Sequence, residues 1–141
     1  MINLQSAAIP YRRTDRQEVE ILLVTSRKRG RWVLPKGKVK RGHLPHASAA
    51  LEAFEEAGVF GAISRIALGT YRQMKFDADG QARPITVRAF PMLVTGENRS
   101  WPEMSVRQRR WMPISKAADA VRNGELRALI QQFAATAPDY A

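Results

Sequence analysis

Residues 37–59 read GKVKRGHLPHASAALEAFEEAGV, a basic stretch with two glycines followed at once by an alanine-rich stretch with three glutamates. The glycines predict a loop over Lys36–His43. Pro45–Ala57 is predicted to be a helix, because proline suits the first turn, alanine propagates a helix and Gly58 can end it. The stretch therefore predicts a basic loop that leads into an acidic helix.

The three glutamates share one face of this predicted helix. At about 100° per residue, Glu52, Glu55 and Glu56 fall within an arc of about 100°. The opposite side can pack on a sheet and consists of Ala50, Ala53, Phe54 and Ala57. Glutamates at these spacings repel one another, and the C-terminal end of a helix disfavours negative charge. The pattern indicates a compensating cation, and hard oxygen ligands favour Mg²⁺ or Mn²⁺. The alternative is a solvated acidic helix face.

Strand and helix patterns are interleaved along the rest of the chain. Strands are predicted over 6–13, 19–25, 32–34, 63–75, 84–95 and 109–112, with a turn at 77–80. Further helices are predicted over 116–121 and 126–136. This order favours the α/β or α+β class with a mixed sheet.

The spacing of the glutamates resembles the signature of the Nudix hydrolase family. That signature is Gly, five residues, Glu, seven residues, Arg-Glu, an aliphatic residue, any residue, Glu-Glu, any residue, Gly and an aliphatic residue. The positions that match in register are Gly37, Glu52, Glu55, Glu56, Gly58 and Val59, with Ala53 at the first aliphatic position. Residues 7–12, 32–37 and 101–111 look like flanking pieces of the branch that cleaves diphosphoinositol polyphosphates and diadenosine polyphosphates. The resemblance implies one domain over residues 1–141, an α/β/α sandwich with a mixed sheet and the family's loop–helix–loop.

Two positions depart from the signature. His43 stands where the family has Glu, and Leu51 stands where it has Arg. In the family these residues carry opposite charges, so our hypothesis is that both ends of one ion pair are lost together, which avoids stranding a single charge. The family's Arg helps to orient the helix, so its loss is expected to cost Glu52 an orienting partner and to weaken activity. At about 100° per residue, Leu51 borders the apolar side of the predicted helix and is expected to extend its packed surface.

The resemblance implies a divalent-metal-dependent hydrolase of a pyrophosphate bond. The implied substrate is nucleoside diphosphate-linked, a dinucleoside polyphosphate or of diphosphoinositol type. Glu52, Glu55 and Glu56 would be the catalytic carboxylates and the ligands of Mg²⁺ or Mn²⁺, with the Gly37 carbonyl as a further ligand. The general base stays open between Glu52 and Glu56. Phosphate oxygens would be held by Lys36 and Lys38, and the further candidates are Arg12, Arg27 and Arg31.

The composition of the chain favours some classes of binding partner and excludes others. The 141 residues include 23 Lys or Arg and 13 Asp or Glu, a net charge of +10 that favours polyanions. A phosphorylated small molecule accounts for this charge. Nucleic acid is less favoured, because no zinc-finger spacing or RNP-type aromatic pattern is found. The absence of cysteine excludes a disulfide scaffold and a thiol nucleophile. No apolar run approaches the about 20 residues of a membrane span, and the first residues do not read as a signal peptide. We therefore expect a cytoplasmic protein with no membrane partner, of open oligomeric state.

Two other functions stay open. Because Leu51 replaces the signature Arg, the chain could be a catalytically weakened Nudix-fold module that binds a nucleotide or polyphosphate. A less favoured alternative is the processing of RNA caps or other nucleic acid, which would use the same chemistry.

Overall fold

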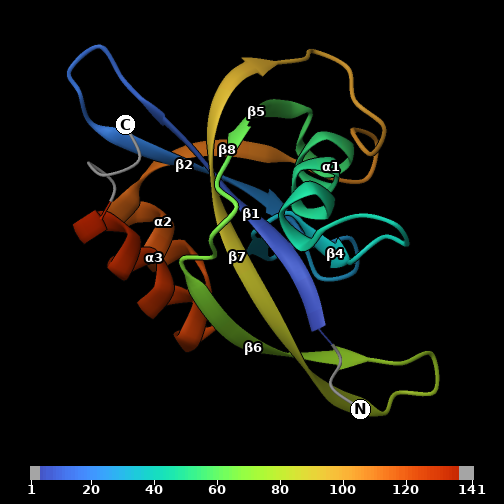
Figure 1. The fold of residues 1–141 in the computed structure, drawn as a ribbon. Coiled ribbons are helices and arrows are strands. Elements are labelled where there is room, and N and C mark those ends of the chain that lie inside the picture. The colour runs from blue at the N-terminus through green and yellow to red at the C-terminus, as the bar shows by residue number, and fades with distance from the viewer. Residues whose placement is uncertain (1–3, 137–141) are drawn as a thin grey trace.

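The computed structural model describes residues 4–136, which form eight strands in one sheet and three helices on its two faces (Figure 1). The strands are β1 (Leu4–Arg13), β2 (Val19–Thr25), β3 (Trp32–Val33), β4 (Lys36–Lys38), β5 (Val59–Ile63), β6 (Gly69–Phe76), β7 (Ala82–Glu97) and β8 (Arg109–Pro113). The helices are α1 (Pro45–Ala57), α2 (Ile114–Ala120) and α3 (Gly124–Thr136). None of these helices is long and apolar enough to cross a membrane.

The strands form one mixed sheet around the parallel pair β1 and β7. In this pair Ala7 lies opposite Ala89, and on its other side β1 runs antiparallel to β2. The strand order is β3-β2-β1-β7-β5, with β4 on β1, β6 on β7 and β8 on β2. The mixed sheet with helices confirms the predicted α+β class.

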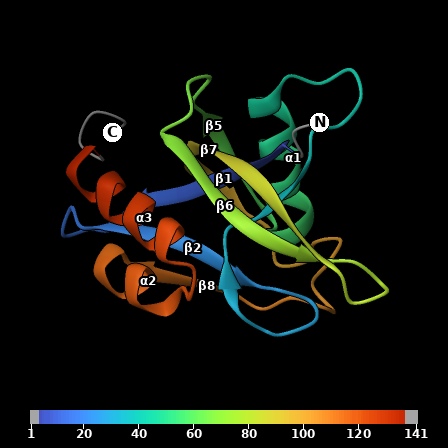
Figure 2. The same ribbon diagram turned by 90° about the horizontal axis from the view of Figure 1, so that it is seen from below.

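The two faces of the sheet carry two hydrophobic cores, because successive side chains of a strand point to opposite sides. On β1, Ile9 and Tyr11 belong to the core under α2 and α3, where the Tyr11 ring meets Phe133 at 5.2 Å. Ala8 belongs to the other core, together with residues of α1. Figure 2 shows α2 and α3 side by side, with α1 on the far side of the sheet. The layers are therefore those of the expected α/β/α sandwich.

Helix α1 has the predicted bounds, but its packed face is rotated from the prediction. Ala49, Ala53 and Ala57 are fully buried against the sheet, whereas the expected Ala50 and Phe54 are only partly buried. The expectation that Leu51 extends the packed side is wrong, because its side chain is exposed. The physical reason is that small alanines let the helix lie close to the sheet, which turns Glu52 and Glu56 inward and Leu51 outward.

Two predicted segments differ from the structure. Residues 36–38, predicted as loop, form β4, because Gly37 pairs with Ser6 of β1. The single strand predicted over 63–75 is wrong in its first part. β5 ends at Ile63 and β6 begins at Gly69, because each pairs with a different part of the long strand β7. The predicted turn at 77–80 is confirmed by the bond from the Asp77 amide to the Gln81 carbonyl.

The close approach of α1 to the sheet predicts the cost of a larger side chain there. Ala53→Leu is expected to lower the free energy of unfolding by about 1–3 kcal/mol, because the added methylenes meet a filled core. Urea unfolding measures this difference. The matched control is Ala128→Leu on the exposed side of α3, which is expected to change stability by less than about 0.5 kcal/mol. Equal effects of the two substitutions would contradict the packing of α1.

Candidate functional site

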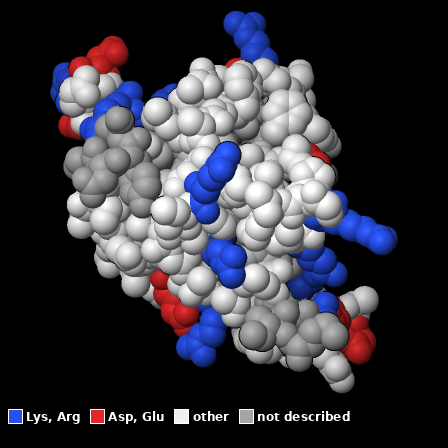
Figure 3. Space-filling model, viewed as in Figure 1, with Lys and Arg blue, Asp and Glu red and all other residues white. Residues whose placement is uncertain are grey.

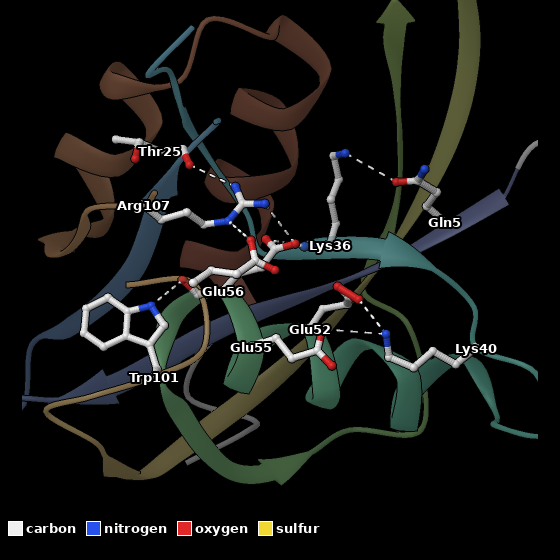
Figure 4. Close-up of polar contacts among 10 residues, drawn as sticks. Gln5, Thr25, Lys36, Lys40, Glu52, Glu55, Glu56, Trp101 and Arg107 are labelled. Carbon is white, nitrogen blue, oxygen red and sulfur yellow. Dashed lines mark hydrogen bonds and ion pairs between the residues drawn. The ribbon is translucent and has the colours of Figure 1, made fainter. Parts of the chain in front are cut away.

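The acidic face of α1 lies against two other segments of the chain. One is β4 with the loop that follows it, and the other is the connection between β7 and β8 that carries Trp101 and Arg107. Figure 4 shows the Lys40 side chain at the carboxylates from the first segment and Arg107 from the second, while the Lys36 side chain extends to Gln5 and only the Lys36 backbone amide meets Glu56. The three predicted glutamates therefore meet basic side chains that are distant from them in the sequence.

Glu52 and Glu55 share the ammonium group of Lys40. Lys40 Nζ lies 3.0 Å from Glu52 Oε1 and 3.7 Å from Glu55 Oε2. The hydrogen bond to Glu52 is the main reason that the pKa of Lys40 is raised. The Lys40 amide also donates to Ser48 Oγ at 3.0 Å, which ties the loop to α1. The expectation that Glu52 lacks an orienting partner is therefore corrected, because Lys40 supplies one from the loop.

Gly37 brings the backbone of β4 against the Glu52 carboxylate. A Cβ atom at position 37 would lie 2.6 Å from the carboxyl atoms of Glu52, closer than real side chains approach. Glu52 is therefore buried against main chain, and only glycine leaves it room.

Glu56 is the most enclosed of the three carboxylates, with 5% of its surface exposed. It accepts a hydrogen bond of 3.3 Å from the Lys36 amide, and Arg107 Nη2 lies 3.3 Å from its other oxygen. Arg107 is held in place by Glu103 at 2.8 Å and by the carbonyl of Thr25 at 3.0 Å. Burial raises the pKa of Glu56 to about 8, because the loss of solvent outweighs the attraction of Arg107. Glu56 is thus a carboxyl group that can exchange a proton near neutral pH.

The C-terminal end of α1 is held by two side chains that follow β7. Trp101 Nε1 donates to the Glu56 carbonyl at 2.9 Å, and Arg109 Nη1 donates to the Ala57 carbonyl at 2.8 Å. The Arg109 guanidinium also stacks on the Trp101 ring at 3.8 Å. These contacts satisfy helix carbonyls and place positive charge where the helix dipole favours it. They stabilise the turn of α1 that carries Glu55 and Glu56.

A cavity of about 1020 Å³ begins at Glu56 and is strongly basic. Three of the predicted phosphate-binding residues, Arg27, Arg31 and Lys36, line it. Five further basic residues of its lining are Lys28, Arg29, Lys75, Arg107 and Arg122, while Glu56 is the one acid among the residues that line it. Burial lowers the pKa of Lys36, whose Nζ donates to Gln5 Oε1 at 3.3 Å.

Two of the predicted phosphate-binding residues do not line this cavity. Arg12 pairs with Glu20 at 2.9 Å and stacks on Trp111 at 4.2 Å. Lys38 lies exposed on β4. The structure therefore separates Arg12 and Lys38 from the other three.

The sequence analysis missed Lys40 and did not assign a role to Arg107. Lys40 belongs to the acid-free basic loop 36–43, and Arg107 belongs to the basic cluster 107–110. A search for a cation able to replace the missing signature Arg could have found Lys40. No local pattern connects Arg107 to Glu56.

Within residues 4–136, no three His, Asp or Glu side chains are placed to hold a metal ion as they stand. The Lys40 ammonium nevertheless lies between two of the carboxylates. Glu52 and Glu55 can therefore direct oxygen atoms at one cation.

Comparison with known proteins points to the same family as the spacing of the glutamates. The NUDIX domain model matches residues 3–133. Nudix hydrolase 21, chloroplastic, of Arabidopsis thaliana is 30% identical over 128 residues, which are 89% of this chain and 63% of the relative. Diphosphoinositol polyphosphate phosphohydrolase 3-alpha of Mus musculus is 32% identical over 107 residues, 74% of this chain and 61% of the relative. This chain thus spans less than two thirds of the length of these relatives.

A solved structure of a C. elegans Ap4A hydrolase binary complex has the same fold. It superposes with a TM-score of 0.72 and 19% identity, over 98% of this chain and 99% of that one. At this identity the likeness concerns the fold.

The burial of Glu56 predicts a titration near neutral pH. Its side-chain carboxyl carbon, followed by NMR in the protein without metal, is expected to titrate with a pKa of about 8, whereas the exposed Glu18 serves as a reference carboxyl. Because the folded pKa lies above the usual 4.5, the folded state alone holds this proton between these values. The free energy of unfolding therefore falls as the pH rises through this window, and Glu56→Gln is expected to remove that part of the slope. A Glu56 midpoint below pH 5 would contradict this account.

Proposed function

This chain belongs to the Nudix family, and from this premise we propose that it is a hydrolase that cleaves a pyrophosphate bond in a phosphorylated small molecule. The observation that carries the proposal is that Glu56, from the acidic face of α1, lies in the lining of the basic cavity. A pyrophosphate placed there would have basic side chains around its oxygens and the Glu56 carboxylate beside it. We further propose that residues 1–141 form a single domain, since the family model matches 3–133 and the sheet is continuous.

We propose that Glu52, Glu55, Glu56 and the Gly37 carbonyl hold a divalent cation, Mg²⁺ or Mn²⁺. These donors are hard oxygen atoms, which both ions prefer. The Lys40 ammonium between Glu52 and Glu55 supports the fit, because a cation already stands where these carboxylates converge. When bound, the ion would neutralise phosphate charge and lower the pKa of water. Lys40 would have to leave the carboxylates to make room for it.

Residues of the chain itself are proposed to bind the phosphate groups and to accept a proton. The Lys36 backbone amide and the Arg107 guanidinium contact Glu56, and both residues line the cavity, so we propose that their side chains hold oxygen atoms of the cleaved phosphate group. Arg27 and Arg31 line the same cavity and are proposed to bind phosphate oxygens of the substrate. Glu56 is the proposed proton acceptor, because it is the one carboxylate among the residues that line the cavity. Arg12 and Lys38 lie outside the cavity and take no part in this proposal.

The substrate class is proposed from the relatives and from the charge of the cavity. Nucleoside diphosphate-linked compounds, dinucleoside polyphosphates and diphosphoinositol-type compounds all combine a pyrophosphate bond with high negative charge. The relative from Mus musculus is named for diphosphoinositol polyphosphate and the C. elegans neighbour for Ap4A. A cytoplasmic location stays a prediction, and the plant relative is named chloroplastic.

Nucleic acid fits this proposal less well than a small molecule. On the face shown in Figure 3, as far as the described residues cover it, Lys and Arg lie as separate groups among uncharged atoms. A nucleic-acid backbone is bound by a continuous basic patch or stripe. The face in Figure 3 therefore offers nucleic acid no such patch, whereas eight Lys and Arg residues line the cavity that we assign to a small molecule.

Binding without turnover is a second candidate function, because Lys40 occupies the proposed cation position and Leu51 replaces the signature Arg. Such a protein would bind a nucleotide or polyphosphate and release it unchanged. The two candidates differ in whether product forms.

Hydrolysis by the purified full chain with Mg²⁺ or Mn²⁺ tests the proposal. The substrates are Ap4A, ADP-ribose and a diphosphoinositol phosphate, and product release is followed. Glu55→Gln and Glu56→Gln are each expected to lower kcat by about 100-fold or more, because they remove a proposed ligand or proton acceptor. Glu18→Gln, on an exposed turn, is the matched control and is expected to keep full activity. Turnover that survives both site substitutions would rule out this site, and binding without product would favour the second candidate.

Substitution of Lys40 tests whether its ammonium group occupies the position of the proposed divalent cation. Lys40→Met is expected to lower the Tm of the metal-free protein, because the carboxylates then repel one another without a counterion. It is also expected to tighten Mn²⁺ binding in calorimetry by about 3- to 10-fold, since one competing positive charge is gone. The exposed neighbour Arg41 provides the matched control, Arg41→Met, with little expected change. Weaker Mn²⁺ binding by Lys40→Met would mean that Lys40 does not compete with the ion.

A further inference from the structure

A second hollow of about 600 Å³ lies beside the basic cavity. The two share the side chains of Arg29, Arg31, Trp32 and Arg122. Neither Glu56 nor Lys36 lines the smaller hollow, so the shared residues mark the side of the large cavity that lies away from the carboxylates. Arg29 and Arg31 come from the β2–β3 connection, Trp32 begins β3, and Arg122 lies in the connection between α2 and α3, which is far from the others in the sequence.

The three arginines at this junction have no acidic partner in the part of the chain that the structure describes. No Asp or Glu lines the smaller hollow, and Arg29, Arg31 and Arg122 form no ion pair among residues 4–136. The charge of Arg122 is the main cause that lowers the pKa of the Arg31 guanidinium, with smaller contributions from desolvation and then from the charge of Arg29. Like charges gathered without a counterion repel one another, and a bound anion would relieve that repulsion.

Both connections are held in fixed shapes. In the β2–β3 connection, the Ser26 amide donates to the Arg31 carbonyl at 2.7 Å, and Ser26 Oγ accepts from the Arg31 amide at 3.0 Å. The Arg29 guanidinium stacks on the Phe76 ring at 4.8 Å. Next to Arg122, Asn123 Nδ2 donates to the Arg72 carbonyl at 2.7 Å. The backbones that carry the three arginines are therefore set before any ligand arrives.

We infer that Arg29, Arg31 and Arg122 form a second anion subsite that binds a phosphate group remote from the cleaved pyrophosphate bond. This inference rests on the proposed function and narrows its substrate class. The substrate carries at least one phosphate beyond the pair that is cleaved, and the two parts occupy one cavity of about 1020 Å³. That volume is at the upper end of small-molecule sites, so the ligand is a compact polyphosphate and not a nucleic-acid chain.

A ligand without a pyrophosphate bond separates this inference from the proposed function. Inositol hexakisphosphate carries only phosphate monoesters, so the proposed reaction does not consume it. Its binding to the full chain is measured by calorimetry in EDTA at low salt, where metal plays no part and charge effects are least screened. Arg122→Gln and Arg31→Gln are each expected to weaken binding by about five-fold or more, since each removes a charge-assisted hydrogen-bond donor.

The control substitution removes one positive charge from a position outside both hollows. Arg16→Gln lies on the exposed β1–β2 turn, outside both hollows, and is expected to leave the affinity within about two-fold. Equal weakening by all three substitutions would mean that only net charge matters and would overturn the subsite. If the unaltered chain did not bind inositol hexakisphosphate, the subsite would be overturned as well. The proposed function would then still be tested separately, by comparing hydrolysis by the unaltered chain with hydrolysis by Glu55→Gln.

A single-stranded RNA oligonucleotide tests the other kind of polyanion in the same assay. Displacement of inositol hexakisphosphate only at RNA concentrations far above that of the small ligand supports the compact ligand. Tighter binding of RNA, lost in Arg122→Gln and kept in Arg16→Gln, would overturn it in favour of a nucleic-acid site.

Discussion

The site depends on the burial of two carboxylates that face one way from a single helix. Glu52 and Glu56 are 7% and 5% exposed, and buried charges are costly unless they are paired or lose their charge. The molecule uses both remedies. Lys40 lies 3.0 Å from Glu52, whereas Glu56 has a raised pKa despite the nearby Arg107.

Residues around the two carboxylates make this burial possible. The alanine face of α1 lets the helix approach the sheet, and Gly37 leaves room for the Glu52 carboxylate against the backbone of β4. Trp101 and Arg109 bind the last carbonyl groups of α1 and so fix the turn that carries Glu56. A carboxylate that is held in place by its neighbours and faces a cavity is placed for chemistry and is not a solvated surface charge.

Positive charge is distributed unevenly around these carboxylates. On the loop side, the single positive charge of Lys40 is shared between Glu52 and Glu55. On the other side, the cavity carries basic residues far in excess of its one acid, Glu56. This asymmetry suits a ligand that is strongly anionic along its length, since its phosphates supply the counter-charges that the protein lacks. The missing signature Arg is consistent with this arrangement, because Lys40 already orients Glu52.

The sequence by itself determined the bounds of α1, the glycine-containing loop before it, the shared face of the three glutamates, and most strands, because helix ends and side-chain periodicity are local properties. Tertiary structure alone decided the rest. The partners of the carboxylates come from distant segments, as Arg109 does, 52 residues from the carbonyl it binds. The raised pKa of Glu56, the outward position of Leu51 and the division of 63–75 between β5 and β6 depend on what packs around each residue. Burial and strand pairing are set by the whole sheet, and no local pattern encodes them.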